Sequence, residues 1–129
     1  MVVVLTESVP DGHLRRLRAG GQSYLFAGDR TVDFPLALAK LRQHFGIARL
    51  LVEGGGRING SLLQAGCIDE LSLLLAPAVD GLTGTPALFD VPGEEEEDSM
   101  GARATLALTA CERLDGGVVW LRYRVSVAP

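Results

Sequence analysis

Three consecutive glycines, Gly54, Gly55 and Gly56, are the feature of this chain that most constrains what it can fold into. They stand between an apolar run, ARLLV at 48–52, and a segment at 57–66 whose apolar residues recur at helical spacing. Glycine in series costs backbone entropy on folding, so the run needs a conformational or a steric reason. Either the turn between the two segments is sharp, or another group approaches the backbone so closely that no Cβ fits.

Strand and helix signals alternate in the first half of the chain. Apolar runs rich in β-branched or aromatic residues predict strands at 2–5 and 23–29, with a short basic helix at 13–19 between them. The run at 48–52, which is apolar on consecutive positions, is typical of a strand buried on both faces. A strand, a helix and a strand in this order predict a right-handed parallel crossover that ends at 48–52.

The helix of that crossover has a signal at each end. Asp33 is a candidate N-cap, Pro35 lies in the first turn, and Gly46 follows the last turn. Four apolar residues between these signals share one helical face: Phe34, Leu38, Leu41 and Phe45. A helix with one apolar face is expected to cover a sheet.

The second half of the chain predicts β-structure that ends in a hairpin. A strand is expected at 69–79, and the turn sequence at 115–117 separates two long β-rich runs. The fold class predicted is therefore α/β, with a mixed, mostly parallel sheet flanked by helices and a C-terminal antiparallel hairpin. We expect a single domain over residues 1–129.

A long connection at 80–102 separates the strand from the hairpin. It is rich in glycine and proline and contains five adjacent acidic residues at 94–98. Connections of this length are usually lids, binding loops or disordered segments, so we expect a mobile loop whose acidic run points into solvent.

The composition excludes several classes of partner. The formal net charge of −4 provides no basic field for nucleic acid and disfavours anionic membranes, and no apolar run approaches the ~20 residues that span a bilayer. The residues that most often bind metals, His13, His44, Cys67 and Cys111, show no metal-ligand spacing, so no metal site is predicted. We expect both cysteines to be reduced and the protein to be cytoplasmic.

The glycine run matches neither of two familiar phosphate motifs. A Walker loop requires Gly-Lys-Ser/Thr, whereas the glycines here are followed by Arg57 and Ile58. A Rossmann fingerprint requires a third spaced glycine where this chain has Asn59. The context still favours an anion site, because the free N–H groups and dipole of a helix N-terminus attract phosphate. A tight turn that binds nothing is the alternative, and the residues alone leave both open.

The longer stretch LLVEGGGRINGSLLQAGCIDELSLLLAPAVDG resembles the reductase domain of riboflavin-biosynthesis deaminase-reductases, which has the dihydrofolate reductase fold. The matching residues are Val52, Glu53, Gly54, Gly55, Gly66, Asp69, Glu70 and Pro77. The resemblance implies NADPH as cofactor, with its pyrophosphate received by the turn that comprises Gly54, Gly55, Gly56, Arg57, Ile58 and Asn59. It also implies that the strand end at Thr6 and Ser8 lies near the adenosine and its 2′-phosphate.

The same resemblance implies a phosphorylated pyrimidine as substrate. The reaction would reduce 5-amino-6-(5-phosphoribosylamino)uracil to its ribitylamino product by hydride transfer. Glu53 is expected to contact the substrate base, with a scaffolding role for the glycine turn as the alternative. No residue is assigned to catalysis, and a homodimer is expected.

Two departures from the family leave other functions open. The zinc deaminase motifs are absent, so any activity would be reduction alone. The resemblance also starts partway into the family's domain, so we expect an incomplete sheet that is rearranged or completed by a partner chain. The alternatives are a non-catalytic NADPH-binding or dimerisation fragment and a dihydrofolate-reductase-like enzyme with another substrate.

Overall fold

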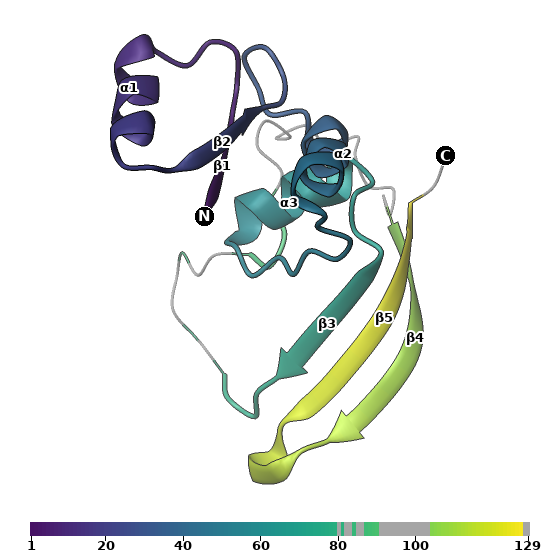
Figure 1. Ribbon diagram of the computed structural model, residues 1–129. Helices are drawn as coiled ribbons and strands as arrows, with labels where there is room; N and C mark the ends of the chain where they lie inside the picture. Colours follow the sequence, from purple (N-terminus) through teal and green to yellow (C-terminus); the bar gives the residue numbers. More distant parts are fainter. Residues whose placement is uncertain (80, 82–83, 85–86, 91–103, 128–129) are drawn as a thin grey trace. The chain divides into compact units, whose positions relative to one another are not determined.

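The computed structural model describes residues 1–79, 81, 84, 87–90 and 104–127 (Figure 1). Its described part forms two compact units, Met1–Leu51 and Val52–Pro129, and each unit is described by itself. The long connection predicted at 80–102 falls mostly outside the described residues, and so does its acidic run at 94–98.

The first unit alternates strands and helices as the sequence predicts. Its elements are β1 (Val2–Leu5), α1 (Asp11–Ala19), β2 (Ser23–Phe26) and α2 (Phe34–Phe45). The two strands are parallel neighbours, with Val2 opposite Ser23 and Leu5 opposite Phe26. Because parallel strands need a crossover, α1 serves as the connection between them.

Both predicted ends of α2 are confirmed. The Asp33 carboxylate accepts a hydrogen bond from the backbone N–H of Leu36 over 2.9 Å, which satisfies one of the donors that a helix start leaves free. Gly46 caps the other end in the left-handed conformation, with φ of 67°. Local side-chain chemistry therefore fixes the length of this helix.

A small core joins α2 to β2. Ala27 is fully buried and packs with Leu25 and Ala37, and half-buried Val4 and Leu41 surround them. The helix thus approaches the sheet through a small residue. Phe45, which was expected on the covered face, is exposed instead.

The second unit consists of one helix and an antiparallel sheet. Its elements are α3 (Gly56–Gln64), β3 (Glu70–Leu75), β4 (Ala104–Arg113), a 3₁₀ turn at Asp115–Gly117 and β5 (Val119–Val127). The strand order is β3-β5-β4, so β5 is central and pairs antiparallel with both neighbours. The hairpin predicted at the C-terminus is confirmed, and its turn requires glycine because Gly116 and Gly117 have φ of 73° and 81°.

The two faces of this sheet differ in chemistry. On the polar face, Trp120 donates its indole N–H to the Ser72 hydroxyl over 2.8 Å. Arg122 pairs there with Glu112 over 2.8 Å and lies 4.5 Å from the Trp120 ring centroid. We call the opposite side the apolar sheet face. Its exposed large apolar residues are Leu75, Leu106, Leu108 and Val127.

The strand predicted at 48–52 is wrong: residues 46–55 adopt neither helix nor strand. Leu51 is 77% exposed, whereas a strand inside a parallel sheet would bury it on both faces. Within the described part of the chain, the run has no neighbouring strand to accept its backbone hydrogen bonds. The predicted crossover into this run is therefore also wrong.

The mixed α/β character is confirmed, with one parallel and two antiparallel strand pairs among the described residues. Within the same residues, no helix is both long enough and apolar enough to cross a membrane.

Candidate functional site

The predicted turn from the glycines into a helix is confirmed. Gly55 is the N-cap of α3, and Gly56 is its first residue. The N–H groups of Ile58 and Asn59 already donate to the carbonyl oxygen of Gly55. No side chain caps this end of the helix in the part of the chain that the structure describes. The amides at the start of α3 therefore face outward with the positive end of the helix dipole behind them.

Two glycines on α3 have a packing reason. A Cβ on Gly56 would overlap the carbonyl oxygen of Ala87, and a Cβ on Gly60 would overlap the backbone of Asp90. Because residues four apart share one helical face, the two glycines form a single seat for a passing backbone. Residues 87–90 occupy this seat, and we call them the strap.

Polar contacts fasten the strap to the first turns of α3. The backbone N–H of Asp90 donates to the carbonyl oxygen of Gly56 over 2.9 Å, and the Asn59 side-chain amide donates to the carbonyl oxygen of Leu88 over 3.0 Å. The guanidinium Nε of Arg57 lies 3.6 Å from a carboxylate oxygen of Asp90. Arg57 and Asn59, which were predicted to bind the cofactor, thus already contact the strap.

Among the residues that the structure describes, nothing gives Gly54 and Gly55 such a reason. Neither has positive φ, and Gly55 lies at φ of −57° and ψ of 170°, which other residues adopt readily. A Cβ on Gly54 would make ordinary contacts with Ile58, and a Cβ on Gly55 would meet no atom within 4 Å. Their missing side chains therefore leave open space in front of the helix start.

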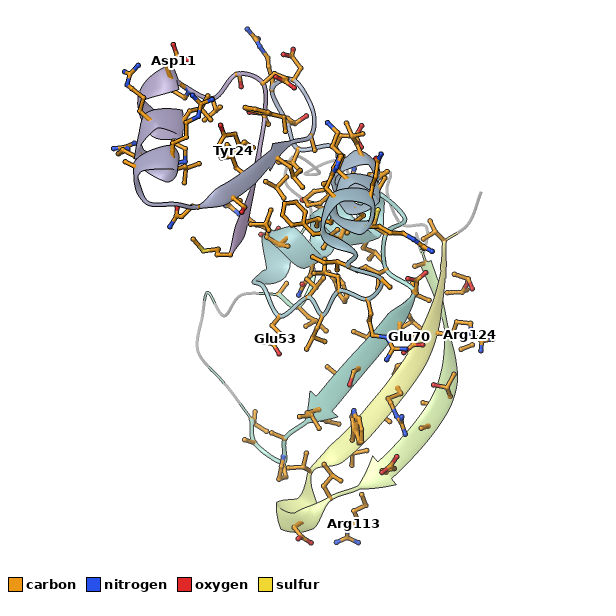
Figure 2. The ribbon with its side chains drawn as sticks, viewed as in Figure 1. Asp11, Tyr24, Glu53, Glu70, Arg113 and Arg124 are labelled. Atoms are coloured by element: carbon orange, nitrogen blue, oxygen red, sulfur yellow. The ribbon has the colours of Figure 1, made fainter. Side chains whose placement is uncertain are left out.

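Glu53 precedes this open space. Its side chain is exposed, and Figure 2 shows it directed away from α3. Within the described residues, no hydrogen bond or ion pair holds its carboxylate. The sequence placed Glu53 at the end of a strand, and that context is wrong because no strand precedes it. As far as the described residues show, the carboxylate can accept a hydrogen bond from an external donor.

Thr6 and Ser8 lie in the first unit, directly after β1. Their hydroxyl groups are 3.0 Å apart, and the backbone N–H of Ser8 donates to the carbonyl oxygen of Asp29. Both residues thus stand at the carboxyl edge of the β1–β2 pair, the edge at which open α/β sheets bind ligands.

An open hollow of about 430 Å³ follows in the same unit. It is lined by Val9, Pro10, Gly12, His13 and Arg16. A guanidinium nitrogen of Arg16 lies 3.5 Å from the Nδ1 atom of His13. Sequence reasoning gave these residues no role, although His13 and Arg16 stand one helical turn apart in a visibly basic helix.

The sequence also did not indicate the strap. Its residues belong to the segment expected to be a mobile loop, yet residues 87–90 are bonded to α3. The signal that could have revealed this contact is the spacing of Gly56 and Gly60 in a helix, where two small residues on one face favour close backbone approach.

Comparison with known proteins identifies relatives of one kind. A family model described as the RibD C-terminal domain matches residues 1–120. The chain is 36% identical over 95 residues to a protein of Methanothermobacter thermautotrophicus named 2,5-diamino-6-ribosylamino-4(3H)-pyrimidinone 5′-phosphate reductase; the match covers 74% of this chain and 43% of that protein. It is also 36% identical over 78 residues to the riboflavin biosynthesis protein RibD of Bacillus amyloliquefaciens, covering 60% of this chain and 21% of the relative. The chain thus spans less than half the length of these relatives.

Solved structures share the fold. A pyrimidine reductase-like protein from Corynebacterium diphtheriae superposes with a TM-score of 0.76 at 21% identity, covering 98% of this chain and 50% of that one. RibD from Acinetobacter baumannii superposes with a TM-score of 0.69 at 20% identity, covering 97% of this chain and 37% of that one.

Proposed function

The chain belongs to the RibD C-terminal domain family, and from that membership we propose that it is an NADPH-dependent reductase of riboflavin biosynthesis. Its substrate is a ribosylamino-pyrimidine 5′-phosphate, such as 5-amino-6-(5-phosphoribosylamino)uracil, whose opened ribose is reduced to a ribityl chain. The reductase name of the Methanothermobacter relative supports this substrate class.

The observation that carries the proposal is the open space at Gly54 and Gly55. Neither the backbone conformation nor a neighbouring atom of the described residues calls for glycine at Gly55. An external group that approaches the backbone is the remaining reason. The uncapped start of α3 makes that group an anion, and the cofactor pyrophosphate fits this requirement.

The residues present fit NADPH in the following roles. The amides at Gly55 and Gly56 bind the pyrophosphate, and Arg57 adds a positive charge beside it. Ile58 and Asn59 continue the turn that presents these groups. The hydroxyl groups of Thr6 and Ser8 bind near the adenosine 2′-phosphate.

When bound, NADPH supplies the hydride. Glu53 orients the substrate. A carboxylate accepts hydrogen bonds from the ring N–H and amino groups of a pyrimidine more strongly than a neutral side chain does. We also propose that the protein is a homodimer in the cytoplasm. The exposed leucines of the apolar sheet face support the dimer.

The test is a fluorescence titration of the chain with NADPH and with NADH, followed by an assay of NADPH oxidation. The assay offers the uracil substrate, the 2,5-diaminopyrimidinone named for the relative, and dihydrofolate. We expect tighter binding of NADPH than of NADH, and oxidation with a ribosylamino-pyrimidine phosphate. Binding without turnover would identify a non-catalytic NADPH-binding chain, and turnover of dihydrofolate alone would identify a different reductase. Failure of the folded chain to bind NADPH would refute the proposal.

A further inference from the structure

The ion pair between Arg57 and Asp90 stands at the start of α3, beside the open space at Gly55. Arg57 is the only charged residue of α3. The Asp90 Cβ lies 3.4 Å from the position of a Cβ on Gly56, so its carboxylate is adjacent to the first turn. An anion bound at this turn would meet both charges.

The Arg57 guanidinium is held only loosely by the Asp90 carboxylate. The Nε to Oδ2 distance of 3.6 Å exceeds the 2.7–2.9 Å of a strong charge-assisted hydrogen bond. The side chains are 82% and 53% exposed, so water screens their attraction. The guanidinium can leave Asp90 for another anion at little cost.

The Asp90 side, in contrast, is fixed. The Asp90 backbone donates to Gly56 and lies in the seat formed by Gly56 and Gly60. Its carboxylate therefore stays beside the helix start when Arg57 turns away. Because an acidic group is favoured near a helix N-terminus, this carboxylate competes with a bound anion for the positive end of the helix dipole and for Arg57.

We infer that the Arg57–Asp90 contact is an exchangeable ion pair: a phosphate group at the start of α3 takes Arg57 from Asp90, and Asp90 lowers the affinity for that phosphate. Asp90 is a positioning residue in this scheme, since it acts on the ligand through Arg57 and through its own charge. The inference rests on the proposed cofactor site and adds to it a residue that sets affinity and salt dependence.

The test combines Asp90→Asn, Arg57→Gln and the double variant, each titrated with NADPH and with inorganic pyrophosphate by calorimetry at low and high salt. Asp90→Asn keeps the backbone hydrogen bond and the size of the side chain. It should tighten binding about threefold at low salt, a modest factor because the charges are exposed. High salt should remove most of this gain. Arg57→Gln should weaken binding, and in its background the gain from Asp90→Asn should fall by half or more.

Asp115→Asn is the charge-matched control, because Asp115 is exposed at the hairpin turn at the other end of the sheet (Figure 1). It should leave both affinities unchanged. NADPH binding that Asp90→Asn does not tighten would overturn the inference and leave the proposed function standing. Pyrophosphate binding that follows the expected pattern without NADPH binding would support the exchange and refute the cofactor. If neither ligand binds, both are refuted.

Discussion

The backbone amide of Asp90 donates a hydrogen bond of 2.9 Å to the carbonyl oxygen of Gly56. This bond ties the first residue of α3 to the strap, which comes from a distant part of the sequence. The three consecutive glycines therefore have two different roles. Gly56 makes room for the strap, whereas Gly54 and Gly55 leave space that the described chain does not fill.

A glycine in the seat of the strap and a glycine outside it should respond in opposite ways to replacement by alanine. Gly60→Ala should lower the free energy of unfolding by about 1 kcal/mol, because overlap with the Asp90 backbone outweighs the gain of ~1 kcal/mol in helix propensity. Gly12→Ala in α1 should raise stability by up to about 1 kcal/mol, since its Cβ would meet only an Arg15 side-chain nitrogen at 3.9 Å. Urea denaturation followed by circular dichroism measures both. A Gly60→Ala protein as stable as wild type would contradict the seat.

The N-cap of α2 predicts a graded response at Asp33. Asp33→Ala removes the acceptor for the Leu36 N–H and should destabilise the protein by about 1 kcal/mol. Asp33→Asn retains an acceptor oxygen and should lose much less. Chemical denaturation of the two variants under the same conditions gives the comparison. Equal losses in both would mean that the side-chain cap does not stabilise this helix.

Sequence reasoning succeeded where the structure depends on neighbouring residues. The ends of α2 follow from Asp33 and Gly46, and the hairpin turn follows from glycines that adopt positive φ. Such signals act within a few residues, so one sequence is enough to read them.

Sequence reasoning failed where the structure depends on residues that are far apart in the sequence. The run at 48–52 has the composition of a buried strand, but a strand also needs neighbours for its backbone hydrogen bonds. The strap depends in the same way on a fit between Gly60 and Asp90, which are far apart in the sequence. The location of the glycine turn could be predicted from the sequence. The hydrogen bond from the Asn59 side chain to the Leu88 carbonyl oxygen could not.

The open space at Gly55 predicts a steric block. Gly55→Val should abolish NADPH binding and leave the far-ultraviolet spectrum nearly unchanged, because valine tolerates this backbone conformation and a Cβ at this position meets no atom of the described residues within 4 Å. Gly55→Ala should give a smaller loss of affinity, in keeping with its smaller side chain. Fluorescence titration with NADPH provides the readout. A folded Gly55→Val protein with wild-type affinity would exclude this turn as the cofactor site.

The proposed homodimer predicts a mass of twice the 13.7 kDa chain in sedimentation velocity. Leu108 lies on the apolar sheet face and is 56% exposed, so Leu108→Glu should shift the protein toward the monomer if this face is covered by a second copy. The matched change on the polar face is Ala107→Glu, at an exposed position opposite Arg124, and it should leave the mass unaltered. A wild-type protein that sediments as a monomer at all concentrations would refute the dimer.

The last prediction concerns the exposed carboxylate of Glu53. A scaffolding role would require hydrogen bonds from the glycine turn, and none holds this side chain within the described residues. The role that we propose is contact with a bound substrate, whose ring would present N–H donors to the carboxylate. Glu53→Gln keeps the shape of the side chain and removes its charge.

We therefore expect Glu53→Gln to lower kcat or raise KM by at least ~10-fold, about 1.4 kcal/mol, with little change in NADPH affinity. Steady-state kinetics with the ribosylamino-pyrimidine phosphate and a separate NADPH titration distinguish the two effects. Glu70→Gln is the charge-matched control, since Glu70 lies on the sheet opposite Arg124 (Figure 2) and should change neither quantity. If Glu53→Gln instead weakens NADPH binding and leaves the substrate kinetics intact, Glu53 supports the turn and does not contact the substrate.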